Sequence, residues 1–97
     1  MIEVGRVKVD GCTASWLRVD LPDSPPLVAI IGETGFVMCG FLNVDAAERL
    51  GVTAAVVSGV KTFDDVLRAE VKAVTSKAEL RGIRRGMTGL EALRLLF

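Results

Sequence analysis

The segment MIEVGRVKVDGCTASWLRV, residues 1–19, decides the first part of the fold because a turn dipeptide lies near its centre. Asp10-Gly11 is typical of the two-residue type I′ turn that joins two antiparallel β-strands. This turn also determines the register of the hairpin, in which Val9 should lie opposite Cys12. The sequence therefore predicts a β-hairpin with a defined pairing along its whole length.

The apolar positions of this hairpin change phase at a single rung. On the first strand they are odd-numbered down to Val7 and even-numbered from Val4 to the N-terminus. The second strand changes phase at the same place, where Gly5 lies opposite Trp16. Because glycine has no side chain, the Trp16 ring has room at this rung. We expect a strongly twisted ribbon whose two halves cover different surfaces.

A second hairpin follows the turn-rich segment Asp20–Pro26. Its strands are Leu27–Ile31 and Phe36–Cys39, joined across Gly32–Gly35. Both strands are continuously apolar, which predicts burial on both faces, as in a central strand. Burial under a partner subunit would give the same pattern.

The next part of the chain predicts a helix, a strand and a second helix. Asn43 is a good N-cap for a helix that ends at Gly51. Val52–Val57 is a short run with high β-propensity. Thr62, followed by Asp65, predicts the start of the second helix.

Two short helices are predicted near the C-terminus. Ser76 with Glu79, and Thr88 with Glu91, have the spacing of a capping box. Before them, Val71–Val74 is compatible with either a strand or the tail of a helix.

These elements indicate the α+β class, because strands come first and helices follow. We expect an antiparallel sheet from two N-terminal hairpins plus a short later strand, packed against three or four short helices. At 97 residues the chain should form a single domain, residues 1–97, with one core.

The chain is unusually apolar for its size. Apolar residues make up 51% of it, and the mean hydropathy is +0.46. No apolar run approaches the roughly 20 residues of a membrane span, and the N-terminus, with its alternating charges, does not resemble a signal peptide. Apolar surface in excess of one small core predicts burial between subunits, so we expect a homo-oligomer and no membrane partner.

The charges and the cysteines limit the partners and metal sites that the chain could have. The formal net charge is zero, which argues against nucleic acid as a partner. Residues 1–48 nevertheless carry three Lys/Arg against seven Asp/Glu, whereas residues 49–97 carry nine against five. Two cysteines without histidine suit the reducing cytoplasm and offer no zinc spacing, so we expect no metal and no cofactor. Gln is absent and Asn43 is the only Asn, which favours a thermophilic or archaeal source.

Three blocks of the sequence resemble one known family. They are GFVMCGFLN at residues 35–43, VSGVKTFDDVLRAEV at residues 57–71 and GIRRGMTGLEAL at residues 82–93. In this order they are similar to the YunC-like family of small bacterial and archaeal proteins, a domain-of-unknown-function family, from about Leu27 to the end of the chain. The resemblance implies a compact cytoplasmic domain and carries over no established activity. The positions of interest on the family pattern are Cys39 with Gly40, Gly59–Thr62 and Gly86–Gly89.

Cys39 is the candidate nucleophile or redox thiol. A reactive cysteine needs a neighbouring histidine, a cation or a helix N-terminus to form its thiolate, and this chain has no histidine. Only a cation such as Lys61 or an arginine, or the dipole of the helix predicted to start at Asn43, could support it. Its apolar neighbours Met38 and Phe41 favour the alternative, a small side chain packed in the core.

The loop Ser58–Thr62 is a candidate anion site. Gly59 precedes Lys61 and Thr62 at the start of a predicted helix, where free N–H groups and a cation attract anions. The GxxxxGK[ST] spacing of a phosphate-binding loop is missing. Two aspartates in the first turn of the helix already complement its dipole, so we favour an ordinary capped turn.

Arg81, Arg84 and Arg85 form a small basic cluster that could hold a carboxylate or phosphate. Such clusters are more often solvated surface or salt bridges. If the fold brings them to Lys61, two helix starts and four cations would meet in one anion site. The carboxylate pairs of the chain show no metal-binding loop, so no metal site is predicted.

These observations predict a non-catalytic, homo-oligomeric cytoplasmic domain that binds a small ligand or a protein partner. One alternative is a thiol-dependent enzyme or redox protein using Cys39. A second alternative is an enzyme that binds a small anion at Lys61.

Overall fold

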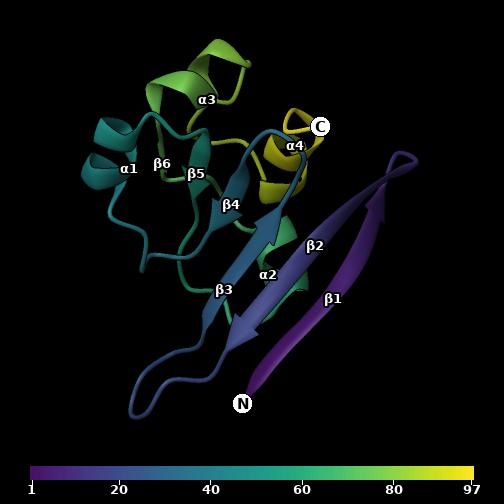
Figure 1. The fold of residues 1–97 in the computed structure, drawn as a ribbon, viewed down its shortest axis with the longest axis vertical. Helices are drawn as coiled ribbons and strands as arrows, with labels where there is room; N and C mark the ends of the chain where they lie inside the picture. The colour runs from purple at the N-terminus through teal and green to yellow at the C-terminus, as the bar shows by residue number, and fades with distance from the viewer.

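The computed structural model describes the whole chain, Met1–Phe97. Six strands form one sheet in the order of the sequence, β1-β2-β3-β4-β5-β6 (Figure 1). The strands are β1 (Ile2–Val9), β2 (Cys12–Val19), β3 (Leu27–Ile31), β4 (Phe36–Met38), β5 (Ala54–Val56) and β6 (Ala73–Val74). All neighbours are antiparallel except β4 and β5, which are parallel.

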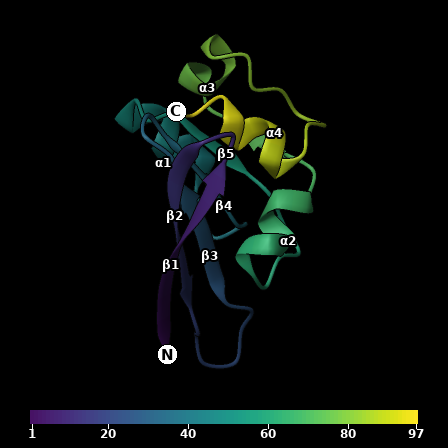
Figure 2. The same ribbon diagram turned by 90° about the vertical axis from the view of Figure 1, so that its right-hand side faces the viewer.

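Four short helices complete the fold: α1 (Val44–Leu50), α2 (Phe63–Arg68), α3 (Ser76–Leu80) and α4 (Gly89–Arg94). Figure 2 shows α2 and α4 on one side of the strands and α1 toward the other. The α+β class and the mostly antiparallel sheet are therefore confirmed. None of the four helices is long and apolar enough to cross a bilayer.

The sheet also contains two features that the sequence pattern did not predict. Two later strands join it instead of one, because the ambiguous segment Val71–Val74 contributes the strand β6. The strand β5 is parallel to β4. The connection through α1 carries the chain from the end of β4 back to the edge of the sheet where β4 begins.

The first hairpin has the predicted turn and register. Val9 pairs with Cys12, and both turn residues, Asp10 (φ 52°) and Gly11 (φ 83°), have the positive φ of a type I′ turn. Gly5 pairs with Trp16, and a Cβ on Gly5 would lie only 2.5 Å from Cε2 of the indole. The two apolar halves of this ribbon face opposite sides of the sheet, as the phase change predicts.

Paired residues point to the same face, so the register assigns each side chain to one of two faces. One row of paired residues across β1 to β4 points toward α2 and α4: Gly5, Trp16, Ile30 and Val37. The neighbouring row lies on the other face of the sheet: Val4, Leu17, Ala29 and Met38. The core lies on the helix side, where Ile30 and Val37 are fully buried and the Trp16 ring stacks on Phe63 of α2 with centroids 4.9 Å apart.

Most predicted helix caps are confirmed. Asn43 accepts the N–H of Ala46, Thr62 accepts the N–H of Asp65, and Thr88 with Glu91 forms a complete capping box.

One predicted cap is wrong: the N-cap of α3 is Thr75, and Ser76 is the first helical residue. Thr75 is buried, and its hydroxyl accepts the N–H groups of Ala54 and Ala78 and donates to the carbonyl of Val52. Packing against β5 therefore selects the threonine.

Candidate functional site

A pocket of about 320 Å³ lies at the carboxyl ends of β4 and β5. Because these two strands are parallel, the loops that follow them leave the sheet at the same edge. The lining residues are Pro25, Pro26, Cys39, Gly40, Phe41, Ser58, Gly59, Val60 and Lys61.

The two loops then diverge. The loop after β4 leads to α1, and the loop after β5 leads to α2, which lies on the helix side of the sheet (Figure 2). In sheets with parallel strands, a crevice forms where neighbouring connections run to opposite sides, and ligands bind there. The pocket occupies this position in the fold.

Cys39 lies just past the end of β4, on the wall of the pocket. It is 4% exposed, and its Sγ accepts a hydrogen bond from the N–H of Val28 at 3.4 Å. The N–H of Cys39 donates to the carbonyl of Val28 at 3.0 Å, while its own carbonyl accepts the N–H of Leu42 at 3.2 Å. The thiol thus provides the acceptor for Val28 at the point where the chain turns out of the sheet.

Five backbone N–H groups in the pocket loops donate no hydrogen bond within the chain. They belong to Gly40, Phe41, Ser58, Gly59 and Val60. The positive φ of Gly59, 72°, turns the second loop at this point. Because backbone N–H groups require acceptors, these donors are available to solvent or to a ligand.

The backbone of Lys61 is held at both ends, and its side chain is free. Its N–H donates to Oδ2 of Asp65 at 3.1 Å, and its carbonyl accepts Nε of Arg18 at 2.8 Å. The bond from the Lys61 N–H is the main reason why the pKa of Asp65 lies below its usual value. The ammonium of Lys61 forms no ion pair.

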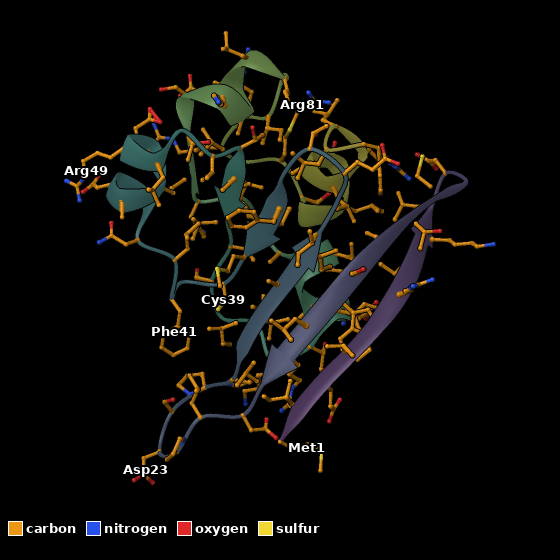
Figure 3. The ribbon with its side chains drawn as sticks, in the orientation of Figure 1. Met1, Asp23, Cys39, Phe41, Arg49 and Arg81 are labelled. Carbon is orange, nitrogen blue, oxygen red and sulfur yellow. The ribbon has the colours of Figure 1, made fainter.

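The outer wall of the pocket is apolar. Pro25 and Pro26 come from the segment that leads into β3, and Phe41 is half exposed. Figure 3 shows Cys39 and Phe41 near each other below β4, with the loop that carries Asp23 beneath them. The pocket therefore has mostly apolar walls, and its lining residues include one unpaired cation and several whose N–H groups have no partner in the chain.

Comparison with known sequences identifies the family. The family described as "Domain of unknown function (DUF1805)" matches residues 38–96, more than half of the chain. The chain belongs to the DUF1805 family. The resemblance to YunC-like proteins is thus confirmed, and both pocket loops fall within the matched residues.

Two related proteins are similar to this chain beyond the residues 38–96 that the family matches. The chain is 33% identical to the uncharacterized protein YunC of Bacillus subtilis over 97 residues, which cover 96% of this chain and 95% of YunC. The crystal structure of a protein of unknown function from Thermoplasma acidophilum has a TM-score of 0.95 and 32% identity, covering 100% of this chain and 94% of that one. Sequence and fold therefore agree on the family over essentially the whole chain.

The fold does not place the predicted arginines, Arg84 and Arg85, in the lining of the pocket. Arg84 donates to the carbonyls of Glu79 and Ile83, at 2.9 and 3.2 Å. Arg85 has no hydrogen bond or ion pair within the chain, and neither arginine lines the pocket. Figure 3 shows Arg81 beside α3, well away from Cys39.

Of the predicted site residues, the DUF1805 pocket brings together Cys39, Gly59 and Lys61. Thr62 is next to it and serves as the N-cap of α2. Sequence reasoning missed Pro25, Pro26 and Phe41 as lining residues, because nothing local connects the segment before β3 with the loops after β4 and β5.

Proposed function

We propose that this protein is a non-catalytic, homo-oligomeric binding domain whose pocket takes a small molecule with an apolar body and a carboxylate. The observation behind this proposal is that Lys61, whose ammonium forms no ion pair, lines a mostly apolar pocket together with five residues whose N–H groups have no partner in the chain. Its volume lies at the lower end of the range for small-molecule sites, about 300–1,000 Å³.

The chemistry of the lining supports an anionic group on the ligand. Backbone N–H groups and an ammonium are donors, and they complement a carboxylate. Pro25, Pro26 and Phe41 would bury the apolar part of the same molecule. The start of α2 contributes no vacant donor at Lys61, since the carboxylate of Asp65 already takes that N–H.

Thermal stability tests the ligand class. Hexanoate and inorganic phosphate would be titrated separately while unfolding is followed. We expect hexanoate to raise the free energy of unfolding by about 2.7 kcal/mol at a concentration a hundredfold above its Kd. Phosphate at the same concentration should have a smaller effect, because it lacks an apolar body and should bind more weakly. The gain should be lost in Lys61→Ala and kept in Arg85→Ala, a matched removal of an exposed cation outside the pocket. Equal responses in both variants would contradict the proposal.

A second candidate function is favoured by one specific observation, since Cys39 and Lys61 line the same pocket. In that case the thiol would act as a nucleophile or redox group. We prefer binding because Sγ already accepts the Val28 N–H and the chain has no histidine to act as a base. Rapid labelling of Cys39 by iodoacetamide in the native protein, slowed in Lys61→Ala, would favour the enzyme instead.

The oligomer and the compartment are also part of this proposal. A 51% apolar composition supports self-association, and sedimentation at micromolar concentration tests it. Two free thiols, Cys12 and Cys39, support a reducing compartment such as the cytoplasm.

A further inference from the structure

We propose that Arg18 is a positioning residue for the pocket, which holds the backbone of Lys61 from outside the lining. Arg18 lies on β2 and is not among the residues that line the pocket. Its effect on a ligand would therefore pass through Lys61, which does line the pocket. This inference rests on the proposed binding of a carboxylate and adds the residue that keeps the cation of that site in place.

The side chain of Arg18 reaches Lys61 on the side of the sheet where α2 lies (Figure 2). Residues two apart on a strand point to the same face, so Arg18 shares the face of Trp16, which stacks on Phe63 of α2. Nε of Arg18 donates to the carbonyl of Lys61 at 2.8 Å, although the two residues are 43 positions apart in the sequence. The strand β2 therefore contacts the chain both at Lys61 and at the start of α2.

The guanidinium of Arg18 is also held on its other side. Its Nη1 lies 2.7 Å from Oδ1 of Asp20 and 3.8 Å from Oε1 of Glu3. The Arg18 side chain is only 27% exposed, so these contacts are partly shielded from water. Because an arginine presents its N–H donors in a rigid planar fork, the pair with Asp20 orients Nε toward the carbonyl of Lys61.

Lys61 is the first residue of its loop whose backbone is fixed by hydrogen bonds. The N–H groups of residues 58–60 have no partner in the chain, whereas the N–H of Lys61 donates to Oδ2 of Asp65 at 3.1 Å. Arg18 holds the carbonyl on the other side of the same Cα. With both adjoining peptide groups fixed, the direction of the Cα–Cβ bond of Lys61 is fixed too, and its ammonium samples only the space that the side-chain rotamers reach from there.

This anchoring should matter for the charged part of a ligand. A cation that is already confined near the pocket loses less conformational entropy when it pairs with a carboxylate. The apolar body of the ligand would contact Pro25, Pro26 and Phe41, which Arg18 does not hold. Loss of the Arg18 bond should therefore weaken the binding of a carboxylate and leave the binding of a neutral molecule with the same apolar body unchanged.

The positive charge of Arg18 is the other way in which this residue could influence a carboxylate. Two neutral replacements separate the charge from the hydrogen bond. Arg18→Met removes both. Arg18→Gln removes the charge and keeps an N–H donor at the same distance along the side chain as Nε. The hydrogen bond is therefore responsible for any difference between the two variants that is confined to the carboxylate.

NMR titrations of ¹⁵N-labelled protein with hexanoate and hexanamide test the positioning role, because they measure weak as well as tight binding. We expect Arg18→Met to raise the Kd for hexanoate about fivefold and Arg18→Gln to raise it about twofold or less. The Kd for hexanamide should not change in either variant. Arg6→Met is the matched control, since it removes an exposed arginine of β1 that forms no ion pair, and it should bind both molecules like the wild type.

Relaxation of the same amides tests the anchoring without a ligand. The Thr62 N–H belongs to the peptide group whose carbonyl Arg18 holds. Its order parameter should be near the rigid value of about 0.85 in the wild type and in Arg18→Gln, and it should fall in Arg18→Met. Far-UV circular dichroism establishes that each variant is folded.

Two results would overturn the positioning role while leaving carboxylate binding by the wild type intact. Equal affinities of Arg18→Met and Arg18→Gln for hexanoate would show that Arg18 acts through its charge alone. Equal losses of hexanoate and hexanamide binding would show that Arg18 only maintains the shape of the pocket. A wild-type chain that binds neither molecule would instead overturn the proposed function, and this inference with it.

Discussion

The loop Ser58–Thr62 and the loop Arg81–Thr88 share three sequence features and have different surroundings. Each contains a glycine with positive φ, at 72° for Gly59 and 94° for Gly86. Each also carries basic side chains and ends on a threonine that caps a short helix. From these features alone, the two loops are equivalent candidates for anion binding.

Their hydrogen bonds differ. In the second loop the Arg84 guanidinium donates to two carbonyls, the Gly86 N–H donates to the carbonyl of Val71, and the Val71 N–H donates to the carbonyl of Met87. In the first loop the ammonium of Lys61 and three consecutive N–H groups have no partner in the chain. The comparison shows that a basic, glycine-containing loop can either tie the fold together or leave its donors free for a ligand.

The largest effect is expected for Gly89→Ala, at the first residue of α4, directly after the second loop. A Cβ at Gly89 would collide with the backbone carbonyl of Val66 in α2, whereas a Cβ at Gly86 or Gly59 meets nothing within 4 Å. We expect Gly89→Ala to cost about 3 kcal/mol or more, because two helix backbones would have to separate. Gly86→Ala and Gly59→Ala should each cost about 1–2 kcal/mol, from the left-handed backbone alone. Urea unfolding measures all three, and equal losses would contradict the close approach of α2 and α4.

The next largest effect is expected for Cys39→Ala on the pocket side. This change leaves a small cavity and removes the acceptor of the buried Val28 N–H, so we expect a loss of about 2 kcal/mol. Cys39→Ser keeps an acceptor and should cost less in the same urea experiment. In the native protein, iodoacetamide should label the partly exposed Cys12 faster than Cys39. Equal stability of the two Cys39 variants would show that the thiol contributes only volume.

Removing one cation from each loop should separate their roles. Arg84→Ala should cost about 1 kcal/mol, because an exposed guanidinium then no longer bonds to the carbonyls of Glu79 and Ile83. Lys61→Ala should change the free energy of unfolding by less than about 0.5 kcal/mol without ligand, because its ammonium has no partner. Differential scanning calorimetry of both variants measures this. A larger loss in Lys61→Ala would make Lys61 a structural residue.

The smallest expected effect, and the one that the two loops share, is on pH dependence. Backbone N–H groups, from Lys61 to Asp65 and from Thr88 to Glu91, hold the pKa of each carboxyl below its ordinary value. A carboxyl whose pKa is lowered by folding stabilises the fold above its unfolded pKa, and this stability is lost as the pH falls through the folded pKa. The wild type should therefore lose stability below about pH 4.

Neutral isosteres test this pH dependence at both helix starts. Asp65→Asn and Glu91→Gln should each have a smaller difference in Tm between about pH 5 and pH 3 than the wild type, because an amide does not titrate there. Asp23→Asn, at an exposed loop residue without an ion pair, is the matched control and should follow the wild type. A wild-type pH profile in both isosteres would show that these carboxyls do not stabilise the caps.

Local rules predicted the elements well and their assembly poorly. The register of the first hairpin followed from the Asp10-Gly11 turn, because a two-residue loop leaves only one alignment of its strands. The N-cap of α3 was misplaced by one residue, since Thr75 is selected by hydrogen bonds to the distant residues Val52 and Ala54. The parallel pairing of β4 with β5 also had no local signal, as it depends on the path of α1.

The candidate site was likewise predicted only in part from the sequence. The sequence singled out Cys39, Gly59 and Lys61 as residues with usable chemistry, but it equally offered Arg84 and Arg85. Cys39 and Lys61 meet because two parallel strands end at one edge of the sheet, and the arginines are excluded because their loop is bonded to another segment.

The sequence by itself determined the hairpin, most of the helix caps and the family, because each depends on residues near one another or on blocks in a fixed order. Only the tertiary structure decided which loop keeps free donors and which face of the sheet stays uncovered. The physical reason is that hydrogen-bond partners and covering side chains come from distant segments. Whether a donor or an apolar side chain is satisfied therefore depends on how those segments pack.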